Sequence, residues 1–180
     1  MSLEDKASRI RLILFDVDGV LTDGMVRIHG DGSESKNFSI RDGIAMVWAQ
    51  RAGLKVGLLS ARNSPTTPHR AAQLGLTIVY QGVSSKAEAF GRILAAERVA
   101  EADVAYMGDD IVDLGVLARA GLSAAPADAV PEVREQVDWT SRAKAGRGAA
   151  RELIELILKT QGRWNAVVAA YANEGRANTP

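Results

Sequence analysis

The chain has 180 residues, a formal net charge of zero and no cysteine. This length fits one domain with a sizeable core. The balanced charge argues against nucleic acid and against a membrane surface as partners, and the lack of cysteine excludes disulfides and thiolate chemistry within the chain. No apolar run is as long as a membrane span, and residues 1–11 lack the apolar core of a signal peptide. We therefore expect a cytoplasmic protein.

The first predicted strand, residues 10–15, ends in two carboxylates. Asp16 and Asp18 follow it directly, Gly19 comes next, and Thr22 lies four residues after Asp18. Two acids at the end of a buried strand are costly unless they bind a cation or take part in chemistry. In open α/β sheets, ligands bind at this end of the strands. The segment therefore predicts a ligand site.

The next segment, residues 24–40, departs from the strand and helix pattern of the rest of the chain. Residues 25–29 and 34–40 are strand-like runs that flank Gly30-Asp31-Gly32. This pattern predicts a β-hairpin with a glycine-rich turn. The hairpin would follow the Asp16 and Asp18 turn directly and would be an insertion in a domain that spans residues 8–162.

Strands and helices alternate through the rest of the domain. Apolar runs predict further strands at residues 55–59, 77–80, 104–107, 121–124 and 137–140. Helical periodicity and capping residues predict helices at residues 42–52, 65–74, 87–98, 110–120 and 152–159. This order implies a three-layer α/β/α, Rossmann-like fold around a mostly parallel sheet. Residues 163–180 form a C-terminal tail, in which 164–171 could be a short helix and 175–180 could be frayed.

Other polar residues are expected at the same edge of the sheet. The strand at 55–59 is followed by Ser60 and Arg62, and the strand at 104–107 by Gly108-Asp109-Asp110, with Asp113 three residues later. Lys86 lies near the start of the helix between these strands. The carboxyl ends of parallel strands meet at one edge, so these side chains should gather around one site.

In this order the motifs resemble the haloacid dehalogenase (HAD) superfamily of phosphohydrolases, over nearly the whole chain. The narrower resemblance is to its capless branch of 3-deoxy-D-manno-octulosonate 8-phosphate (KDO 8-phosphate) phosphatases. That branch is indicated by the following segments: Phe15 to Gly24, Phe38 to Gly43, Tyr80-Gln81-Gly82, Gly108 to Asp113, and Arg151-Glu152.

The resemblance implies a mechanism with an aspartyl-phosphate intermediate. Asp16 would be the nucleophile, and Asp18 the general acid and then the general base. Mg²⁺ would be bound by Asp16, Asp109 and the main-chain carbonyl of Asp18. Lys86 and Ser60 would hold the phosphoryl oxygens.

Two acids near the predicted metal site have open roles. Asp110 and Asp113 either orient the groups that bind the metal or lie at a helix N-terminus, where the helix dipole favours acids. We favour the orienting role for Asp113.

The resemblance also implies residues that bind a small phosphorylated sugar acid. The predicted substrate loop is Ser39, Ile40, Arg41, Asp42 and Gly43. Asp18, Lys86, Arg62 and Arg70 would contact the substrate as well, and arginine suits its carboxylate. In the branch, arginine at the position of Arg62 goes with the octulosonate substrate, whereas an acidic residue is typical of sialic-acid-type nonulosonate 9-phosphate phosphatases. Arg62 therefore favours KDO 8-phosphate, and a role in lipopolysaccharide synthesis, over that alternative.

Some residues depart from the pattern of the branch. Ala61 stands where glycine is usual, Val47 where many octulosonate members have a basic residue, and Ala145 where a Gly-Gly pair begins; the helix at 65–74 starts with two prolines. These departures concern the choice of sugar and leave the hydrolytic residues untouched.

Three further alternatives concern assembly and class. The hairpin is either a surface flap of a monomer or, as the resemblance implies, part of a homotetramer in which it covers a neighbour's active site. The tail could likewise reach a neighbouring site or have no fixed structure. From other classes, a phospho-accepting receiver module would also cluster acids, a hydroxyl and a lysine around Mg²⁺, and a catalytically silent member could serve as a scaffold.

Overall fold

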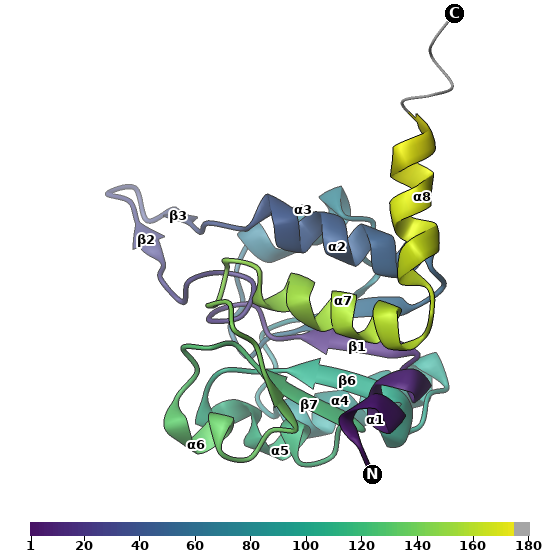
Figure 1. Ribbon diagram of the computed structural model, residues 1–180. Helices are drawn as coiled ribbons and strands as arrows, with labels where there is room; N and C mark the ends of the chain where they lie inside the picture. Colours follow the sequence, from purple (N-terminus) through teal and green to yellow (C-terminus); the bar gives the residue numbers. More distant parts are fainter. Residues whose placement is uncertain (175–180) are drawn as a thin grey trace, which may run out of the picture.

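A six-stranded sheet forms the centre of the computed structural model, which describes residues 1–174 (Figure 1). Its strand order is β5-β4-β1-β6-β7-β8, and all five neighbouring pairs are parallel. The strands are β1 Leu12–Phe15, β4 Lys55–Leu59, β5 Ile78–Tyr80, β6 Val104–Met107, β7 Leu122–Ala125 and β8 Trp139–Thr140. Each lies at a predicted strand, with bounds that differ by at most two residues.

The central strand β1 contributes to the cores on both faces of the sheet. Its four residues are completely buried, and they alternate between the two hydrophobic clusters of the protein. Ile13 and Phe15 belong to one cluster, whereas Leu12 and Leu14 belong to the other. A continuous apolar run is what a parallel strand covered on both faces requires.

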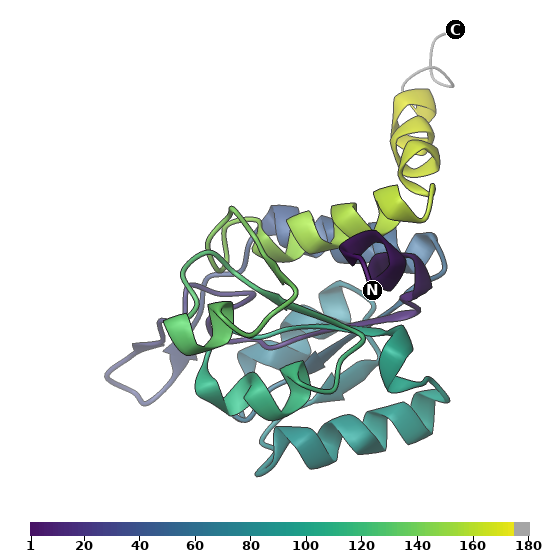
Figure 2. The same ribbon diagram turned by 60° about the horizontal axis from the view of Figure 1, so that its bottom comes forward.

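Helices cover both faces of the sheet and make three layers (Figures 1 and 2). One layer consists of α1 Leu3–Arg9, α2 Ile40–Arg51, α3 Thr66–Gln73 and α7 Ala149–Thr160. The opposite layer consists of α4 Lys86–Glu97, α5 Leu114–Leu117 and α6 Pro131–Arg134. The predicted α/β/α architecture is therefore confirmed.

The predicted hairpin is present but its strands are short. Strand β2 Arg27–Ile28 pairs with β3 Glu34–Ser35 in an antiparallel two-stranded sheet. The hairpin projects beyond the end of the main sheet toward which the strand arrows point (Figure 1). It therefore lies beside the carboxyl ends of the strands, where the acids follow.

Several elements differ from the sequence prediction, among them the short helix α6, which no predicted helix covers. The polar segment at the N-terminus forms α1, which Ser2 and Asp5 cap reciprocally. The helix predicted at residues 110–120 is wrong as one continuous helix: a 3₁₀ turn, η2 Ile111–Asp113, precedes the single turn of α5. The side chain of Asp113 accepts a hydrogen bond from the amide of Asp110, and the side chain of Asp110 accepts one from the amide of Ile111, so these two acids cap the start of the turn.

The last described helix, α8 Trp164–Glu174, points away from the body of the molecule (Figure 1). Its first turn packs edge-on against α2, with 5.6 Å between the ring centroids of Trp48 and Trp164. The short helix expected at 164–171 is thus present, while the expectation for 175–180 lies outside the described residues. No helix within residues 1–174 is long and apolar enough to cross a membrane.

Candidate active site

Three neighbouring strands deliver polar side chains to one pocket. Asp16 follows β1 directly, and Ser60 follows the neighbouring strand β4 directly. On the other side of β1, Asp109 follows strand β6, from whose last residue, Met107, it is separated by Gly108. The pocket has a volume of about 310 Å³. Its lining consists of Asp16, Asp18, Gly24, Val26, Ser60, Ala61, Arg62, Lys86, Asp109, Asp110 and Val112. All of the residues predicted to be catalytic or metal-binding therefore lie together at this pocket.

Lys86 is held between two carboxylates. It is the first residue of α4, and its ammonium Nζ lies 3.0 Å from Asp16 Oδ2 and 2.6 Å from Asp113 Oδ1. All three side chains are at most 8% exposed. Burial opposes the charge on Lys86, but the carboxylates of Asp16 and Asp113 raise its pKa above the ordinary value. Lys86 therefore faces the pocket as an ammonium beside Asp16.

Asp113 is saturated with hydrogen-bond donors. Its Oδ1 accepts from Lys86 and from the hydroxyl of Tyr106, and its Oδ2 accepts from the amides of Asp109 and Asp110 at 3.1 and 3.3 Å. Burial raises the pKa of Tyr106 well above its ordinary value, so this hydroxyl stays protonated and donates. Asp113 thus fixes both the lysine and the loop that bears Asp109.

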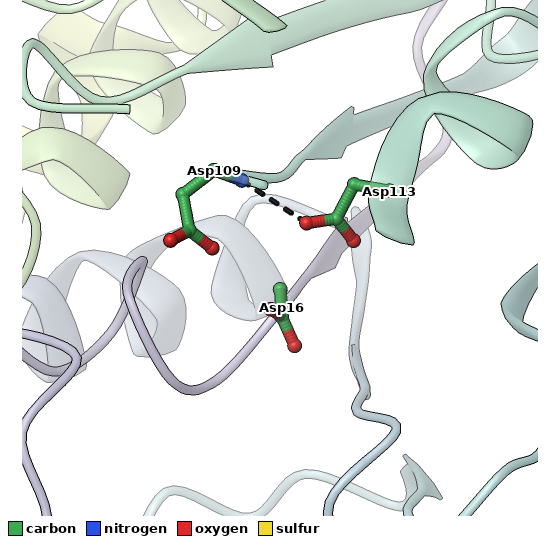
Figure 3. Close-up of side chains that lie close together, drawn as sticks. All are labelled: Asp16, Asp109 and Asp113. Atoms are coloured by element: carbon green, nitrogen blue, oxygen red, sulfur yellow. Dashed lines mark hydrogen bonds between the residues drawn. The ribbon is translucent and has the colours of Figure 1, made fainter. Parts of the chain in front are cut away.

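Asp16, Asp109 and Asp113 form the acidic cluster of the pocket (Figure 3). One carboxylate oxygen of each lies within 4.8 Å of the other two. Burial and the charge of Asp16 raise the pKa of Asp109 to about 8, and burial raises that of Asp16 to about 6 although Lys86 opposes the shift. The carboxylates therefore repel one another as they stand.

The donor set in this cluster fits a hard divalent cation. Asp109 Oδ1 is buried and has no hydrogen-bond partner among residues 1–174. Because Asp113 is already occupied by four donors, Asp16 and Asp109 are the side chains that could bind a metal, and Asp113 would orient them. Oxygen ligands of this kind suit Mg²⁺.

The loop after β1 owes its shape to Gly19 and Thr22. Gly19 has a φ of +87°, and a Cβ atom there would lie 2.0 Å from Asp109 Oδ2. Only glycine lets this loop approach the acid. The hydroxyl of buried Thr22 accepts a hydrogen bond from the amide of Gly24 at 3.2 Å and so closes the turn.

The hairpin reaches back to the pocket through two charged residues that the sequence analysis did not single out. Lys36 Nζ lies 2.7 Å from Asp18 Oδ1 and donates a hydrogen bond to Oδ2 at 2.9 Å. Glu34 pairs with Arg62 and accepts a hydrogen bond from the hydroxyl of Ser64. That hydrogen bond is the main reason why the pKa of Glu34 lies below its ordinary value. Both predicted pocket residues, Asp18 and Arg62, thus have partners on the hairpin.

The predicted substrate loop lies elsewhere on the same chain. Ser39 caps α2, exposed Ile40 and Arg41 follow, and the buried carboxylate of Asp42 accepts hydrogen bonds from the amides of Gly148 and Arg151. None of these residues lines the Asp16 pocket. Ser39 and Arg41 instead line a second hollow of about 520 Å³, together with Asp23, Asn37, Phe38, Gly146 and Arg147.

Arg70 also lies outside the Asp16 pocket. Its guanidinium donates to the carbonyl of Ser39 at 3.3 Å and covers Gly43, where a Cβ atom would meet Arg70 Nη2 at 2.3 Å. Within one chain, Arg70 and Gly43 therefore brace the start of α2.

Comparisons with known proteins agree with this geometry. A family model of haloacid dehalogenase-like hydrolases matches residues 71–153. The 3-deoxy-D-manno-octulosonate 8-phosphate phosphatase KdsC of Escherichia coli K12 is 41% identical over 158 residues, which are 88% of this chain and 84% of the relative. This chain belongs to the KdsC family of HAD-like phosphatases.

Solved structures of KdsC family members have the same fold. A crystal structure of 3-deoxy-D-manno-octulosonate 8-phosphate phosphatase from Yersinia pestis is 38% identical, with a TM-score of 0.88 over 89% of this chain and 87% of that one. The enzyme from Moraxella catarrhalis, in complex with magnesium ion, phosphate ion and a KDO molecule, is 31% identical, with a TM-score of 0.92 over 94% of this chain and 97% of that one.

Sequence reasoning missed the network that surrounds the predicted KdsC family residues. Tyr106, Lys36 and Glu34 contact the predicted site residues Asp113, Asp18 and Arg62, respectively, and Ser64 in turn contacts Glu34. The position of Tyr106, three residues before Asp109 on a buried strand, was a usable signal, because a buried hydroxyl needs a partner. The contacts of Lys36 and Glu34 depend on how the hairpin folds back, which no spacing in the sequence reveals.

Proposed function

We propose that this chain is a Mg²⁺-dependent phosphatase that hydrolyses KDO 8-phosphate to KDO and inorganic phosphate. The observation that carries the proposal is the buried carboxylate of Asp16, which lines the pocket with Lys86 at 3.0 Å on one side and Asp109 on the other. Membership in the KdsC family supports the choice of substrate.

The proposed reaction has two displacements at phosphorus. In the first, an oxygen of Asp16 bonds to phosphorus, the bond from phosphorus to the sugar oxygen breaks, and Asp18 gives its proton to that oxygen. In the second, Asp18 takes a proton from water as the water oxygen bonds to phosphorus, and the bond to Asp16 breaks. This route splits one difficult hydrolysis into two easier steps.

The pocket supplies positive charge for the phosphoryl group. Lys86 and the hydroxyl of Ser60 line it and can donate to the phosphoryl oxygens, on which negative charge is spread in the transition state. Asp16, Asp109 and the main-chain carbonyl of Asp18 would hold Mg²⁺, which offsets the charge of the acids and of the phosphate.

Substrate choice rests on Arg62. Its side chain is 43% exposed at the pocket and can pair with the carboxylate of a sugar acid. A sialic-acid-type nonulosonate 9-phosphate is the alternative substrate, because it carries the same two anionic groups.

We also propose that the active protein is a homotetramer. The predicted substrate loop and Arg70 do not line the Asp16 pocket of their own chain, and Ile40 in that loop is 82% exposed. In a tetramer this loop could complete the pocket of a neighbouring copy. Sedimentation of the purified protein tests this part, and a monomer that turns over at the full rate would contradict it.

The experiment that tests the function is phosphate release with and without Mg²⁺. The substrates are KDO 8-phosphate, a sialic-acid-type 9-phosphate and common hexose phosphates. We expect multiple turnovers and a strong preference for KDO 8-phosphate only when Mg²⁺ is present. Preference for the 9-phosphate would keep the mechanism and reject the substrate, and a yield of at most one phosphate per chain would indicate a receiver module instead.

A further inference from the structure

Lys36 is a buried lysine on an exposed hairpin. Three of the four strand residues of the hairpin are open to solvent, with Ile28 64% exposed, yet the Lys36 side chain is 0% exposed. Its ammonium contacts both carboxylate oxygens of Asp18, at 2.7 and 2.9 Å. Burial of an ammonium is costly unless it is paired, so this contact is a specific feature of the fold and not an incidental surface pair.

Both oxygens of Asp18 lie against this ammonium. Oδ2 accepts a hydrogen bond from Lys36, and the buried Oδ1 lies still nearer to the same Nζ atom. The ammonium therefore holds the whole carboxyl group in one place. A protonated carboxyl group keeps an acceptor oxygen, so Lys36 can hold Asp18 both before and after it gives up a proton.

Lys36 does not itself face the substrate space. It is absent from the lining of the Asp16 pocket, to which Asp18 belongs. Any effect of Lys36 on the reaction must therefore pass through Asp18, in contrast to Lys86, which lines the pocket.

We propose that Lys36 is a positioning residue for Asp18: its ammonium holds the carboxyl group at the pocket, in the place from which Asp18 acts on the leaving group and then on water. The inference rests on the proposed function, in which Asp18 is the acid and base. It gives the hairpin a part in the chemical step of its own chain, in addition to any role as a cover or in assembly.

The test compares two substrates with different need for an acid. The sugar oxygen of KDO 8-phosphate leaves as a basic alkoxide and needs a proton, whereas the phenolate of p-nitrophenyl phosphate leaves without one. Lys36→Met keeps the length of the side chain and removes its charge. We expect kcat for KDO 8-phosphate to fall about tenfold to hundredfold, within the range of general acid catalysis, and kcat for the aryl phosphate to fall less than about threefold.

Three further variants make the result specific. Lys36→Arg keeps the charge and should restore part of the activity on KDO 8-phosphate. Arg27→Met removes a charge from exposed β2 on the same hairpin and should change neither rate. Asp18→Asn should show the same split between the two substrates as Lys36→Met, only larger.

The outcomes separate the inference from the proposed function. Equal losses on both substrates in Lys36→Met, or no loss, would overturn the role of Lys36. If Asp18→Asn shows no split, or the unaltered protein releases no phosphate from KDO 8-phosphate, the proposed function itself fails. Circular dichroism and the melting temperature establish that each variant folds, and Lys36→Gln replaces Lys36→Met if the latter does not.

Discussion

Each of the two acids after β1 is paired with a lysine, but the pairs are built differently. Asp16 meets Lys86 between a central strand and the start of a helix in the core, and Lys86 is held a second time by Asp113. Asp18 meets Lys36, which comes from the hairpin beyond the edge of the sheet. The side of the proposed nucleophile is thus fixed by the fold, and the side of the proposed acid and base by an appended segment.

The difference indicates that the core side of the pocket is rigid, whereas the hairpin side can move. The hairpin ladder consists of only two residue pairs, so it can open at little cost compared with the core strands. A nucleophile gains from rigid placement, whereas a site that must admit and release a sugar needs one side that can move. The predictions below test this contrast, from the largest expected effect to the smallest.

Removal of the proposed nucleophile should have the largest effect. Asp16→Asn keeps the size of the side chain and removes the attacking carboxylate, so we expect kcat on any phosphate ester to fall by about 10³-fold or more. The melting temperature should be nearly unchanged, because the amide can still accept a hydrogen bond from Lys86. Retention of most of the activity in a steady-state assay would exclude the covalent route.

The acidic cluster should make the metal-free protein less stable as pH rises. The pKa of Asp109 is raised to about 8 in the folded state from 3.8, so the folded state holds a proton that the unfolded state has lost. The free energy of unfolding should therefore fall between about pH 4 and pH 8.

Asp109→Asn should remove the larger part of this dependence and leave the smaller contribution of Asp16, whose pKa is raised to about 6. Near pH 8, without Mg²⁺, we expect the variant to be more stable than the unaltered protein by about 1–3 kcal/mol, and to lose the stabilisation that Mg²⁺ gives the unaltered protein. Urea unfolding at several pH values measures both effects, with Glu132→Gln, an exposed acid in α6, as the matched control. A variant that is less stable than the unaltered protein at pH 8 would mean that Asp109 is not strained by its neighbours.

The core side of the molecule was also the more predictable side. The strands β1, β4 and β6 are apolar runs that end in polar residues, and both their existence and their meeting at one edge follow from local pattern and parallel topology. The 3₁₀ turn η2 was not predictable in this way, because it depends on the side chains of Asp110 and Asp113 accepting hydrogen bonds from the amides of Ile111 and Asp110. The amphipathic pattern of residues 110–120 gave no sign of it.

The hairpin side shows where sequence reasoning ends. Glycines predicted a turn near Gly32, but the partners of Glu34 and Lys36 lie 28 and 18 residues away in the chain. Contacts of that kind arise from how two irregular segments pack, and neither periodicity nor spacing encodes them. Asp42 is a related case: its residue type fits a substrate loop, and only the fold reveals its bonds to the start of α7.

A smaller effect is expected from removal of the hydroxyl of Tyr106, which donates a hydrogen bond to Asp113, the residue that holds Lys86 beside Asp16. Tyr106→Phe removes one of four donors to Asp113 and leaves Lys86 and two amides in place. We expect a loss of about 1 kcal/mol in stability and a roughly threefold to tenfold lower kcat, equal for alkyl and aryl phosphates. Tyr80→Phe, on edge strand β5, is the matched control. If kcat fell more for the alkyl phosphate than for the aryl phosphate, Tyr106 would act through Asp18 and not through Asp16, and the contrast between the two sides of the pocket would not hold.

The smallest effect should come from the pair between Glu34 and Arg62 on the hairpin side. If Arg62 binds the substrate carboxylate, Glu34 competes with the substrate for it, so Glu34→Gln should lower KM for KDO 8-phosphate by about twofold to fivefold, as expected for a partly exposed ion pair. The amide can still accept from Ser64, so the hairpin should stay in place, and KM for p-nitrophenyl phosphate, which has no carboxylate, should not change. A higher KM for the sugar phosphate alone would mean that Glu34 orients Arg62 toward the substrate. The hairpin would then form part of the binding site, and the hairpin side of the pocket would be as fixed as the side formed by the core strands.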